Sequence, residues 1–408
     1  MYLNIRFTDR IQFLIKLVFT SFLAFMIIGC SSTPERQQQH ILPVELLNQA
    51  SIPGIPDARF WGDEWPKFSV EKFNSWSDAE LKKNMPSSYG MPHNYLAISG
   101  GGANGAFGAG LLAGWTETGT RPDFNMVTGV STGALTAPFA FLGSAYDDEL
   151  HRVFTTTSTH DIANERGLIS ALLSDSMADT APLKELIAGY ITPEVIEAIG
   201  KEHIKGRRLF IGTVNLDAAR SVIWNIGAIA VSGYPDKNTL IREIMRASAA
   251  IPVAFPPVMI PVEANGQQYD EMHVDGGTGS QVFVYPAAAD WRMITKKLKV
   301  KGDPNVYVIR NAYLDPDYNG VVRGVMPIAG RSIESLIRTQ GIGDLYQIYA
   351  LCERDGNNFN LAYIPADFTV EPTEGFDPVY MRQLYERGYN MAVEGYPWEH
   401  TPPGFIKQ

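Results

Sequence analysis

The segment that decides the fold reads NYLAISGGGANGAFGAGLLAGWTETG over residues 94–119 and, after a short turn, MVTGVSTGALTAPFAFL over residues 126–142. Each part begins with a short apolar run, passes through a glycine-containing turn, and ends in small and apolar residues over a helical length. Two strand–turn–helix units in succession predict parallel strands, because the helix returns the chain to the same end of the sheet. The sequence therefore predicts an α/β fold with a mostly parallel central sheet.

The turn of the second unit carries a serine in the pattern G-x-S-x-G, formed by Gly129, Ser131 and Gly133. A predicted strand before the serine and a predicted helix after it are the context of a nucleophile elbow. A serine at a helix N-terminus also lies where backbone N–H groups and the helix dipole favour developing negative charge. We therefore predict Ser131 as a nucleophile. The alternative interpretation is a tight turn whose serine only caps the helix.

Three consecutive glycines, Gly100, Gly101 and Gly102, follow the first predicted strand. The N–H groups of such a loop can converge on one point, either as a phosphate cradle or as an oxyanion hole. A P-loop would end in Gly-Lys-Ser/Thr, and no lysine stands here; a dinucleotide fingerprint would need an acidic residue at the end of the next strand, and Asp123 lies in an Arg-Pro-Asp turn instead. The oxyanion hole is the better interpretation, because the predicted elbow follows within one strand–helix unit.

A third motif, Asp275-Gly276-Gly277, follows a predicted strand over residues 269–274. A carboxylate followed by two glycines can project into a site without steric cover. Taken alone, Asp-Gly favours a hairpin turn. Together with the serine and the glycine loop, it predicts Asp275 as the base that activates Ser131, because a serine needs a base within hydrogen-bond reach.

In this order, the glycine-rich loop, the G-x-S-x-G pattern and the Asp-Gly-Gly motif resemble the patatin-like phospholipase family. A fourth segment, RASAAIPVAFPP at residues 246–257, is similar to the helix-and-proline block that precedes Asp-Gly-Gly in that family. The resemblance covers residues 93–315. It implies a three-layer α/β/α sandwich around a mostly parallel sheet, and a serine acyl hydrolase that cleaves carboxylic esters of phospholipids or lysophospholipids through an acyl-enzyme.

The resemblance also implies which residues act. The family uses a Ser–Asp dyad without histidine, so Ser131 would attack the ester and Asp275 would take its proton and later activate water. Backbone N–H groups of residues 100–102 would hold the oxyanion. Two flanking positions depart from the family pattern, because Ser99 and Asn104 stand where an acidic and a basic residue are usual.

Other functions remain open at this point. A conventional hydrolase triad in the order Ser, Asp, His would have to use His400, the only histidine after Asp275. A lipid-binding lipoprotein without catalytic activity is a second alternative. An acyltransferase is a third, because an acyl-enzyme can pass its chain to an alcohol instead of water. The pattern does not identify which lipid ester is cleaved.

The N-terminus reads as an export signal. Basic residues lead into a 12-residue apolar run, LVFTSFLAFMII at residues 17–28, which is shorter than the ~20 residues of a spanning helix. Gly29, Cys30, Ser31 and Ser32 follow, and this resembles a bacterial lipoprotein signal whose cysteine becomes lipidated. We therefore expect membrane attachment through lipidated Cys30, with the two serines favouring the outer membrane. The alternative is an uncleaved N-terminal membrane helix.

Net charge and composition limit the classes of partner and cofactor that we expect. The formal net charge is −10, and an acidic surface repels nucleic acid, so a lipid substrate is expected and nucleic acid is not. Two cysteines, Cys30 and Cys352, are too few for a disulfide framework or a Cys-rich zinc site. Because the chain also has no H-E-x-x-H pattern and no calcium loop, no metal and no cofactor are predicted.

The chain divides into a signal peptide (1–29), a lipidated N-terminus and tether (30–90), a catalytic domain (91–320) and a C-terminal, mostly helical extension packed on it (321–408). Residues 155–205 are a candidate lid or insertion, and Gly341-x-Gly343 predicts an interrupted helix. Further strands and helices are expected at residues 208–214, 221–224 and 306–309, and at residues 238–250, 332–351 and 378–389 respectively.

Overall fold

The structure is a computed structural model that describes residues 40–165, 175–316, 318 and 320–406. The predicted signal peptide and Cys30 lie outside the described residues. Across the described ranges, no helix combines the length and the apolar character that a membrane crossing requires.

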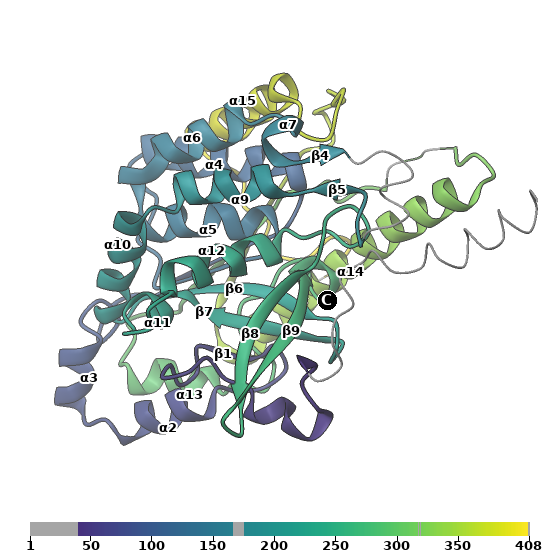
Figure 1. The fold of residues 1–408 in the computed structure, drawn as a ribbon. Helices are drawn as coiled ribbons and strands as arrows, with labels where there is room; N and C mark the ends of the chain where they lie inside the picture. The colour runs from purple at the N-terminus through teal and green to yellow at the C-terminus, as the bar shows by residue number, and fades with distance from the viewer. Residues whose placement is uncertain (1–39, 166–174, 317, 319, 407–408) are drawn as a thin grey trace, which may run out of the picture.

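A mixed sheet forms the centre of the molecule (Figure 1). Its main path runs β1-β7-β6-β3-β2-β10-β11, and the β8–β9 hairpin joins through β6. Strands β6, β3, β2, β10 and β11 are parallel, whereas β7 and β1 add antiparallel strands at one edge. The mostly parallel sheet predicted from the sequence is therefore confirmed. The strand bounds are β1 Arg59–Trp61, β2 Asn94–Ile98, β3 Met126–Gly129, β6 Arg208–Asn215, β7 Arg220–Asn225, β8 Val258–Ala264, β9 Gln267–Asp275, β10 Asn305–Arg310 and β11 Asn358–Tyr363.

Helices cover both faces of this sheet. Side chains alternate along each strand, so Leu96 and Ile98 of β2 enter the larger core beneath α4, α5 and α15, whereas Tyr95 and Ala97 enter a second core beneath α14. This is the predicted three-layer arrangement. The main helices are α2 Lys67–Ser75, α3 Asp78–Asn84, α4 Gly105–Glu117, α5 Thr132–Leu142, α6 Asp147–Thr156, α9 Ala181–Tyr190, α10 Pro193–Ile204, α11 Ile226–Ala230, α12 Lys237–Ser248, α13 Trp291–Lys297, α14 Val325–Asp355 and α15 Pro378–Val393.

The small residues of α4 serve close helix packing. A Cβ atom at Gly110 or Gly114 would collide with the backbone carbonyl of Tyr385 or Tyr389 in α15. Glycine at these positions therefore lets the C-terminal helix lie directly against the helix that follows the glycine-rich loop. Because α15 and α4 pack so closely, the C-terminal region is part of the same core.

Two strands of the sheet come from regions predicted to lack them. Strand β11 belongs to the predicted helical extension and pairs in parallel with β10, and β1 belongs to the predicted tether and pairs with β7. The expected helix interruption at Gly341 and Gly343 is wrong, because α14 is continuous through both residues. Gly341 is small for a packing reason: a Cβ atom there would collide with the guanidinium of Arg310.

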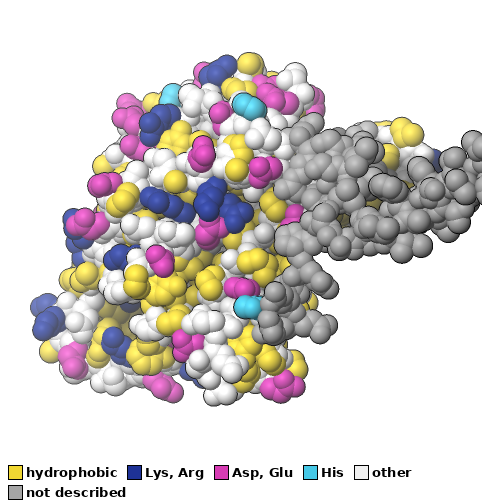
Figure 2. Space-filling view, viewed as in Figure 1, with side chains coloured by type: hydrophobic (Ala, Val, Ile, Leu, Met, Phe, Trp, Pro, Cys, Tyr) yellow, Lys and Arg dark blue, Asp and Glu magenta, His cyan; other side chains and the backbone are white. Residues whose placement is uncertain are grey.

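The candidate lid region contributes to the core. Helices α9 and α10 bury Ile187, Ile196 and Ile199 in the main hydrophobic cluster. Residues 166–174, in the middle of the predicted lid, lie outside the described residues. Over the face of the molecule seen in Figure 2, acidic and basic side chains are interspersed with apolar ones.

Candidate active site

Ser131 occupies a sharp turn between β3 and α5. Its backbone angles are φ 55° and ψ −126°, which a side-chain-bearing residue rarely adopts and which surrounding structure must enforce. The flanking glycines make the turn feasible: a Cβ atom at Gly129 would collide with the carbonyl of Gly133, and one at Gly133 would collide with the carbonyl of Ile98. This geometry is that of a nucleophile elbow.

Asp275 reaches the same place because β3 and β9 use the same flank of β6. Gly129, near the end of β3, pairs with Ile211, and Asp275, the last residue of β9, pairs with Thr213 two positions further along β6. The chain leaving β3 therefore turns at the point where β9 arrives. The Ser131 side chain lies close enough to the Asp275 carboxylate to act on its pKa, so the predicted nucleophile and base lie in the same site.

The Asp275 carboxyl lies in a dry environment. Its side chain is buried, and burial raises the pKa of Asp275 to about 6, although hydrogen bonds from the Ser131 hydroxyl and from the Gly277 N–H oppose that rise. The Gly277 N–H lies 2.7 Å from the carboxylate. A carboxylate with a raised pKa is a stronger base, and it can take a proton near neutral pH.

The N–H groups of the glycine loop fall into two kinds: one is bonded to a neighbouring loop, and two have no partner in the part of the chain that the structure describes. The N–H of Gly100 donates to the carbonyl of Gln281 (3.2 Å), so this amide, predicted as an oxyanion donor, is engaged elsewhere. The N–H groups of Gly101 and Gly102 have no hydrogen-bond partner within the described residues. Gly100 itself lies against the serine, since a Cβ atom there would come within 3.0 Å of the Ser131 Cβ. Two of the three predicted donors therefore remain unengaged beside the nucleophile.

Two residues that the sequence did not single out hold these loops together. The Gln281 side chain donates to the Gly277 carbonyl (2.7 Å), while its backbone N–H donates to the carboxylate of Asp344 in α14 (2.6 Å). Gln281 therefore links the Asp-Gly-Gly loop to the glycine-rich loop, and α14 fixes Gln281. No short motif could have found Asp344, because it lies 63 positions away in the chain.

Ser248 supports the elbow from behind. The N–H of Ser131 donates to the Ser248 hydroxyl (3.0 Å), which in turn donates to the carbonyl of Gly212 in β6 (2.6 Å). Ser248 ends α12 and belongs to the RASAAIPVAFPP segment. That segment therefore acts by fixing the backbone of the strained turn.

The other sequence candidates lie in separate places. His400 binds the carbonyl of Phe359 (3.1 Å), near the start of β11, whereas Ser131 follows the end of β3; two strands, β2 and β10, lie between β3 and β11 in the sheet. His273 is fully buried between Thr213 and Glu271. Asn104, in place of the usual basic residue, accepts a hydrogen bond from the hydroxyl of Tyr380 in α15 (2.6 Å).

The described part of the chain contains no cluster of three or more His, Cys, Asp or Glu side chains arranged to hold a metal ion. Cys352 is buried in α14. The chemical groups of the site are thus a serine hydroxyl, a carboxylate of raised pKa and two unengaged amides, which together suit acyl transfer.

Comparison with known proteins places this geometry in context. Residues 96–288 match the family model described as patatin-like phospholipase. Among solved structures, the chain is similar to VipD from Legionella pneumophila, with 12% identity and a TM-score of 0.36, over 75% of this chain and 66% of that chain, which is slightly less than two thirds of its length. A search of curated proteins found no match. The matched residues include both Ser131 and Asp275 and end before α14 begins.

Proposed function

We propose that this chain, whose residues 96–288 form a patatin-like phospholipase domain, is a lipid acyl hydrolase that works through Ser131 and Asp275. The family match supports lipid acyl hydrolysis in general. The observation that carries the residue assignment is the position of Ser131: it is held in a strained elbow, close enough to act on the pKa of a buried carboxylate, which burial raises to about 6.

The geometry supports a two-step reaction. The Ser131 hydroxyl attacks the ester carbonyl carbon while its proton passes to the Asp275 carboxylate, and the amides of Gly101 and Gly102 bind the oxyanion. Collapse of this intermediate breaks the ester bond, and the departing alcohol takes the proton from Asp275. Water then gives a proton to Asp275 and attacks the acyl-enzyme. The second tetrahedral intermediate then collapses, which releases the carboxylic acid and returns the proton from Asp275 to Ser131.

Preorganised amides are the main electrostatic contribution in this scheme. Losing one donor of an oxyanion hole costs about 2.7–4 kcal/mol of transition-state stabilisation in a well-studied protease. The engagement of Gly100 by Gln281 implies that Gly101 and Gly102 carry this role here. We expect a phospholipid or lysophospholipid as substrate, which is the expectation from the family resemblance.

The cellular setting is part of the same proposal. We expect export and anchoring through a lipidated Cys30, in the outer membrane of a double-membrane cell; Cys30 lies outside the described residues. The Cys30→Ser variant should be released or remain unprocessed. Unchanged membrane retention of this variant would contradict lipid anchoring without affecting the assignment of the catalytic residues.

Active-site labelling and a lipid panel test the proposal. A fluorophosphonate probe should label the wild type and Ser75→Ala, an exposed serine on α2, and should not label Ser131→Ala. The wild type should release fatty acid from at least one phospholipid or lysophospholipid, and Ser131→Ala should not. Failure to label, with lipid still bound, would favour a non-catalytic lipid-binding protein; acyl transfer to an added alcohol in place of fatty-acid release would indicate an acyltransferase.

A further inference from the structure

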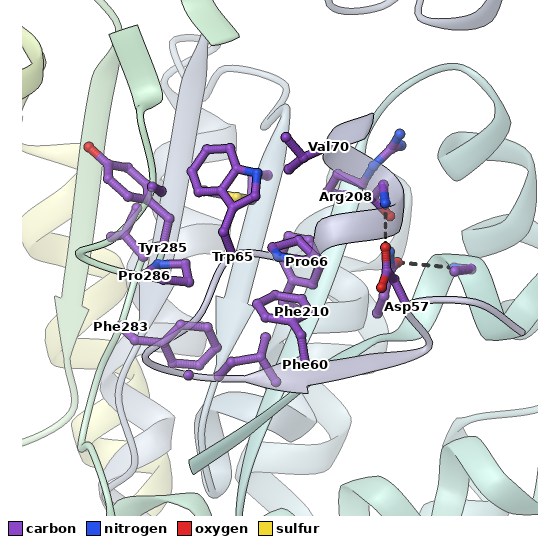
Figure 3. Close-up of a pocket in the computed structure, with 18 of the residues that line it drawn as sticks. Asp57, Phe60, Trp65, Pro66, Val70, Arg208, Phe210, Phe283, Tyr285 and Pro286 are labelled. Carbon is purple, nitrogen blue, oxygen red and sulfur yellow. Dashed lines mark hydrogen bonds between the residues drawn. The ribbon is translucent and has the colours of Figure 1, made fainter. Parts of the chain in front are cut away.

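The second face of the sheet is covered unevenly. Helices α13 and α14 pack against β2, β3 and β10, whereas β6, β7 and β1 lie opposite α2 and leave a cavity of about 910 Å³. Val130 and Gly276 line it, but Ser131 and Asp275 do not, so it is separate from the dyad. Its volume lies within the range of pockets that bury small organic ligands. Apolar and aromatic side chains form its walls, among them Phe60, Trp65, Phe210, Ile223, Phe283 and Tyr285 (Figure 3).

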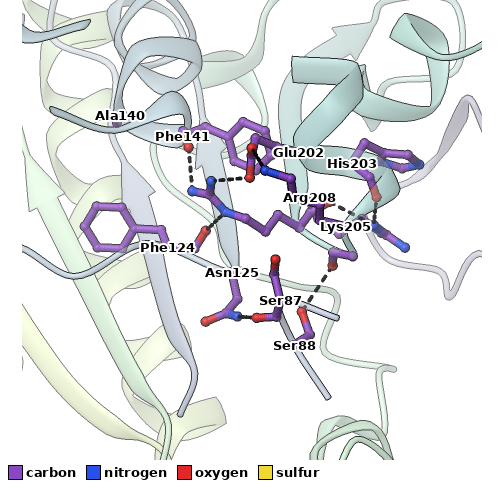
Figure 4. A network of polar contacts seen from close by, with 12 residues as sticks. Ser87, Ser88, Phe124, Asn125, Ala140, Phe141, Glu202, His203, Lys205 and Arg208 are labelled. Carbon is purple, nitrogen blue, oxygen red and sulfur yellow. Dashed lines mark hydrogen bonds and ion pairs between the residues drawn. The ribbon is translucent and has the colours of Figure 1, made fainter. Parts of the chain in front are cut away.

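Two neighbouring arginines, Arg207 and the cavity-lining Arg208, differ in their ion-pair and hydrogen-bond partners. Arg207 is buried and forms an ion pair with Glu202 (2.9 Å), and its Nε donates to the carbonyl of Phe124. Arg208, which lines the cavity, donates only through Nη1, to the carbonyls of His203 and Arg207 (Figure 4). Within the described residues Arg208 has no carboxylate partner, and its Nε and Nη2 atoms are unengaged.

Arg208 is half-buried in this apolar wall, and a charge partly removed from water gains from an anionic partner. Burial lowers the pKa of Arg208 to about 10, and no neighbouring acid offsets this. Other ionic groups of the wall have partners: Arg220 pairs with Asp63 and Glu64, the Asp57 carboxylate accepts the N–H of Ser69, and the Lys72 ammonium lies over the ring of Trp76. Trp65 adds a buried indole N–H without an acceptor. The cavity thus combines apolar walls with unsatisfied donors.

We propose that this cavity binds a single-chain lipid anion, with its acyl chain along the face of β6, β7 and β1 and its anionic head group on Arg208. A carboxylate or phosphate oxygen matches the planar donors of a guanidinium, and the aromatic walls suit a hydrocarbon chain. This site goes beyond the proposed function and needs no turnover.

Displacement of a fluorescent fatty acid, NBD-labelled dodecanoic acid, from full-length Ser131→Ala tests the site. Palmitate and hexadecyl phosphate should compete at least tenfold better than uncharged hexadecanol. Adding Arg208→Gln should remove that preference, Arg208→Lys should keep most of it, and Arg220→Gln is the matched control, because its cation is already paired. Filling the cavity with Ile223→Trp should weaken every competitor.

Three outcomes would overturn the proposal. Equal competition by hexadecanol and palmitate would show that binding does not depend on an anionic head group. Unchanged binding in both Arg208→Gln and Ile223→Trp would place the probe elsewhere, for example at the dyad. If a folded protein, with an unchanged thermal unfolding midpoint, binds no displaceable probe, the cavity is not a lipid-binding site.

A second, independent observation concerns the first half of α14. From Val325 to Gln340 none of its described side chains is buried, and the hydrogen bonds printed from this half to other elements come from Arg338 and Gln340, near its C-terminal end. A helix of this length is marginally stable in water without a packing surface. In Figure 1, α14 extends away from the rest of the fold.

This exposed half, the α14 arm (residues 325–340), is amphipathic. At 3.6 residues per turn one side presents Val325, Ile328, Ile333 and Leu336, whose exposures are 83%, 52%, 47% and 69%, and the other side presents Arg331, Glu334 and Arg338. With Arg323 just before the helix, this segment carries three arginines against one glutamate, in a chain of net charge −10. Basic residues on the polar side of an exposed apolar helix are typical of interfacial membrane helices.

The C-terminal end of the arm lies beside the candidate active site. The Gln340 side chain donates to the carbonyl of Gly279, and Asp344 one turn later binds Gln281. We infer that the α14 arm lies in the surface of an anionic lipid bilayer and presents the dyad to it. The identity of the partner rests on the proposed function, because a lipid hydrolase must meet its substrate at such a surface.

An environment-sensitive label separates this inference from catalysis. In full-length Cys30→Ser protein, where the remaining Cys352 is buried, an NBD label at Ile333→Cys should shift to shorter wavelength with vesicles of phosphatidylethanolamine and phosphatidylglycerol. The same label at Glu334→Cys, on the polar side, should not. No shift at Ile333→Cys, or equal shifts at both positions, would overturn the inference whether or not the protein hydrolyses lipid.

Activity gives a second readout. Leu336→Glu should lower hydrolysis of vesicle phospholipid by roughly tenfold or more and leave hydrolysis of a soluble short-chain ester within about twofold, because only the vesicle reaction needs a membrane-bound arm. An equal loss on both substrates would contradict an interfacial role. Absence of activity on either substrate in the wild type would contradict the proposed function instead.

Discussion

Strand β9 holds two buried carboxylates, Glu271 at its middle and Asp275 at its end, in opposite electrical environments. Burial would raise the pKa of Glu271, but hydrogen bonding from His273 and the charge of Arg59 outweigh it, and the pKa lies below its ordinary value. Asp275, four positions later, has no cation beside it, and burial raises its pKa to about 6. The role of a buried carboxylate therefore depends on whether a cation offsets its charge. Glu271 is paired with Arg59 and joins β1 to the sheet, whereas Asp275 is unpaired and retains the basicity that catalysis needs.

Removing the charge of Asp275 should have the largest effect. We expect Asp275→Asn to lower kcat by on the order of 10⁴-fold, close to the loss in Ser131→Ala, because nucleophile and base act as a unit. Steady-state hydrolysis of a lipid ester measures this, with the thermal unfolding midpoint as a check on folding. Substantial residual activity in a folded Asp275→Asn protein would rule out this base.

Removing the charge of Glu271 should act on stability. Glu271→Gln leaves Arg59 buried without its partner, and breaking a buried ion pair in this way costs about 3–5 kcal/mol. Urea denaturation of the two proteins gives the difference. Asp78→Asn, which breaks an exposed pair with Lys299, is the control and should barely move the midpoint. A similar small effect for Glu271→Gln would contradict a structural role for the pair.

The pH profile should report Asp275 alone. Because the base must be ionised, kcat/KM should rise with pH, reach half its plateau near pH 6, and fall roughly 100-fold by pH 4. A soluble ester measured across this range, with stability checked at each pH, tests this. A midpoint near 4, the ordinary value for aspartate, would indicate an exposed carboxylate and a weaker base.

The same pKa predicts a stability gain from losing the charge. The pKa of Asp275 in the folded state, about 6, lies above the ordinary value of 3.8, so the folded state favours the protonated form. That contribution is fully present below about pH 4 and is lost as pH rises through 6. Asp275→Asn should therefore be more stable than the wild type at pH 8, by about 1–3 kcal/mol, and the difference should vanish near pH 4. A destabilised variant at pH 8 would contradict an uncompensated charge.

The smallest effect is expected at His400. Its imidazole binds a backbone carbonyl near the start of β11, on the opposite side of the fold from the elbow. We expect His400→Ala to keep kcat within about twofold of the wild type in the same ester assay. A loss comparable with that of Ser131→Ala would replace the dyad by a triad.

Much of the site could be predicted because its motifs are local. The glycines of the elbow and of the loop after β2 each stand close together in the chain, so a short pattern records them, although a Cβ atom at Gly133 or Gly101 would collide with the distant Ile98 or Asn311. The parallel sheet could be predicted for the same reason, from two strand–turn–helix units. Strands β1 and β11 could not, because they are short segments whose pairing with β7 and β10 depends on distant partners.

By itself, the sequence determined the elbow at Ser131, the glycine loop, the Asp-Gly-Gly motif and the α/β character, since each is recorded in a short stretch of residues or in a local periodicity. Only the tertiary structure decided that β3 and β9 pair with the same edge of β6, that Gln281 engages the amide of Gly100, and that Asp344 holds Gln281. It alone decided too that Arg207 has a carboxylate partner whereas Arg208 has none among the described residues. The physical reason is that hydrogen bonding, burial and charge compensation depend on which residues meet in space, and residues far apart in the chain leave no local pattern of their meeting.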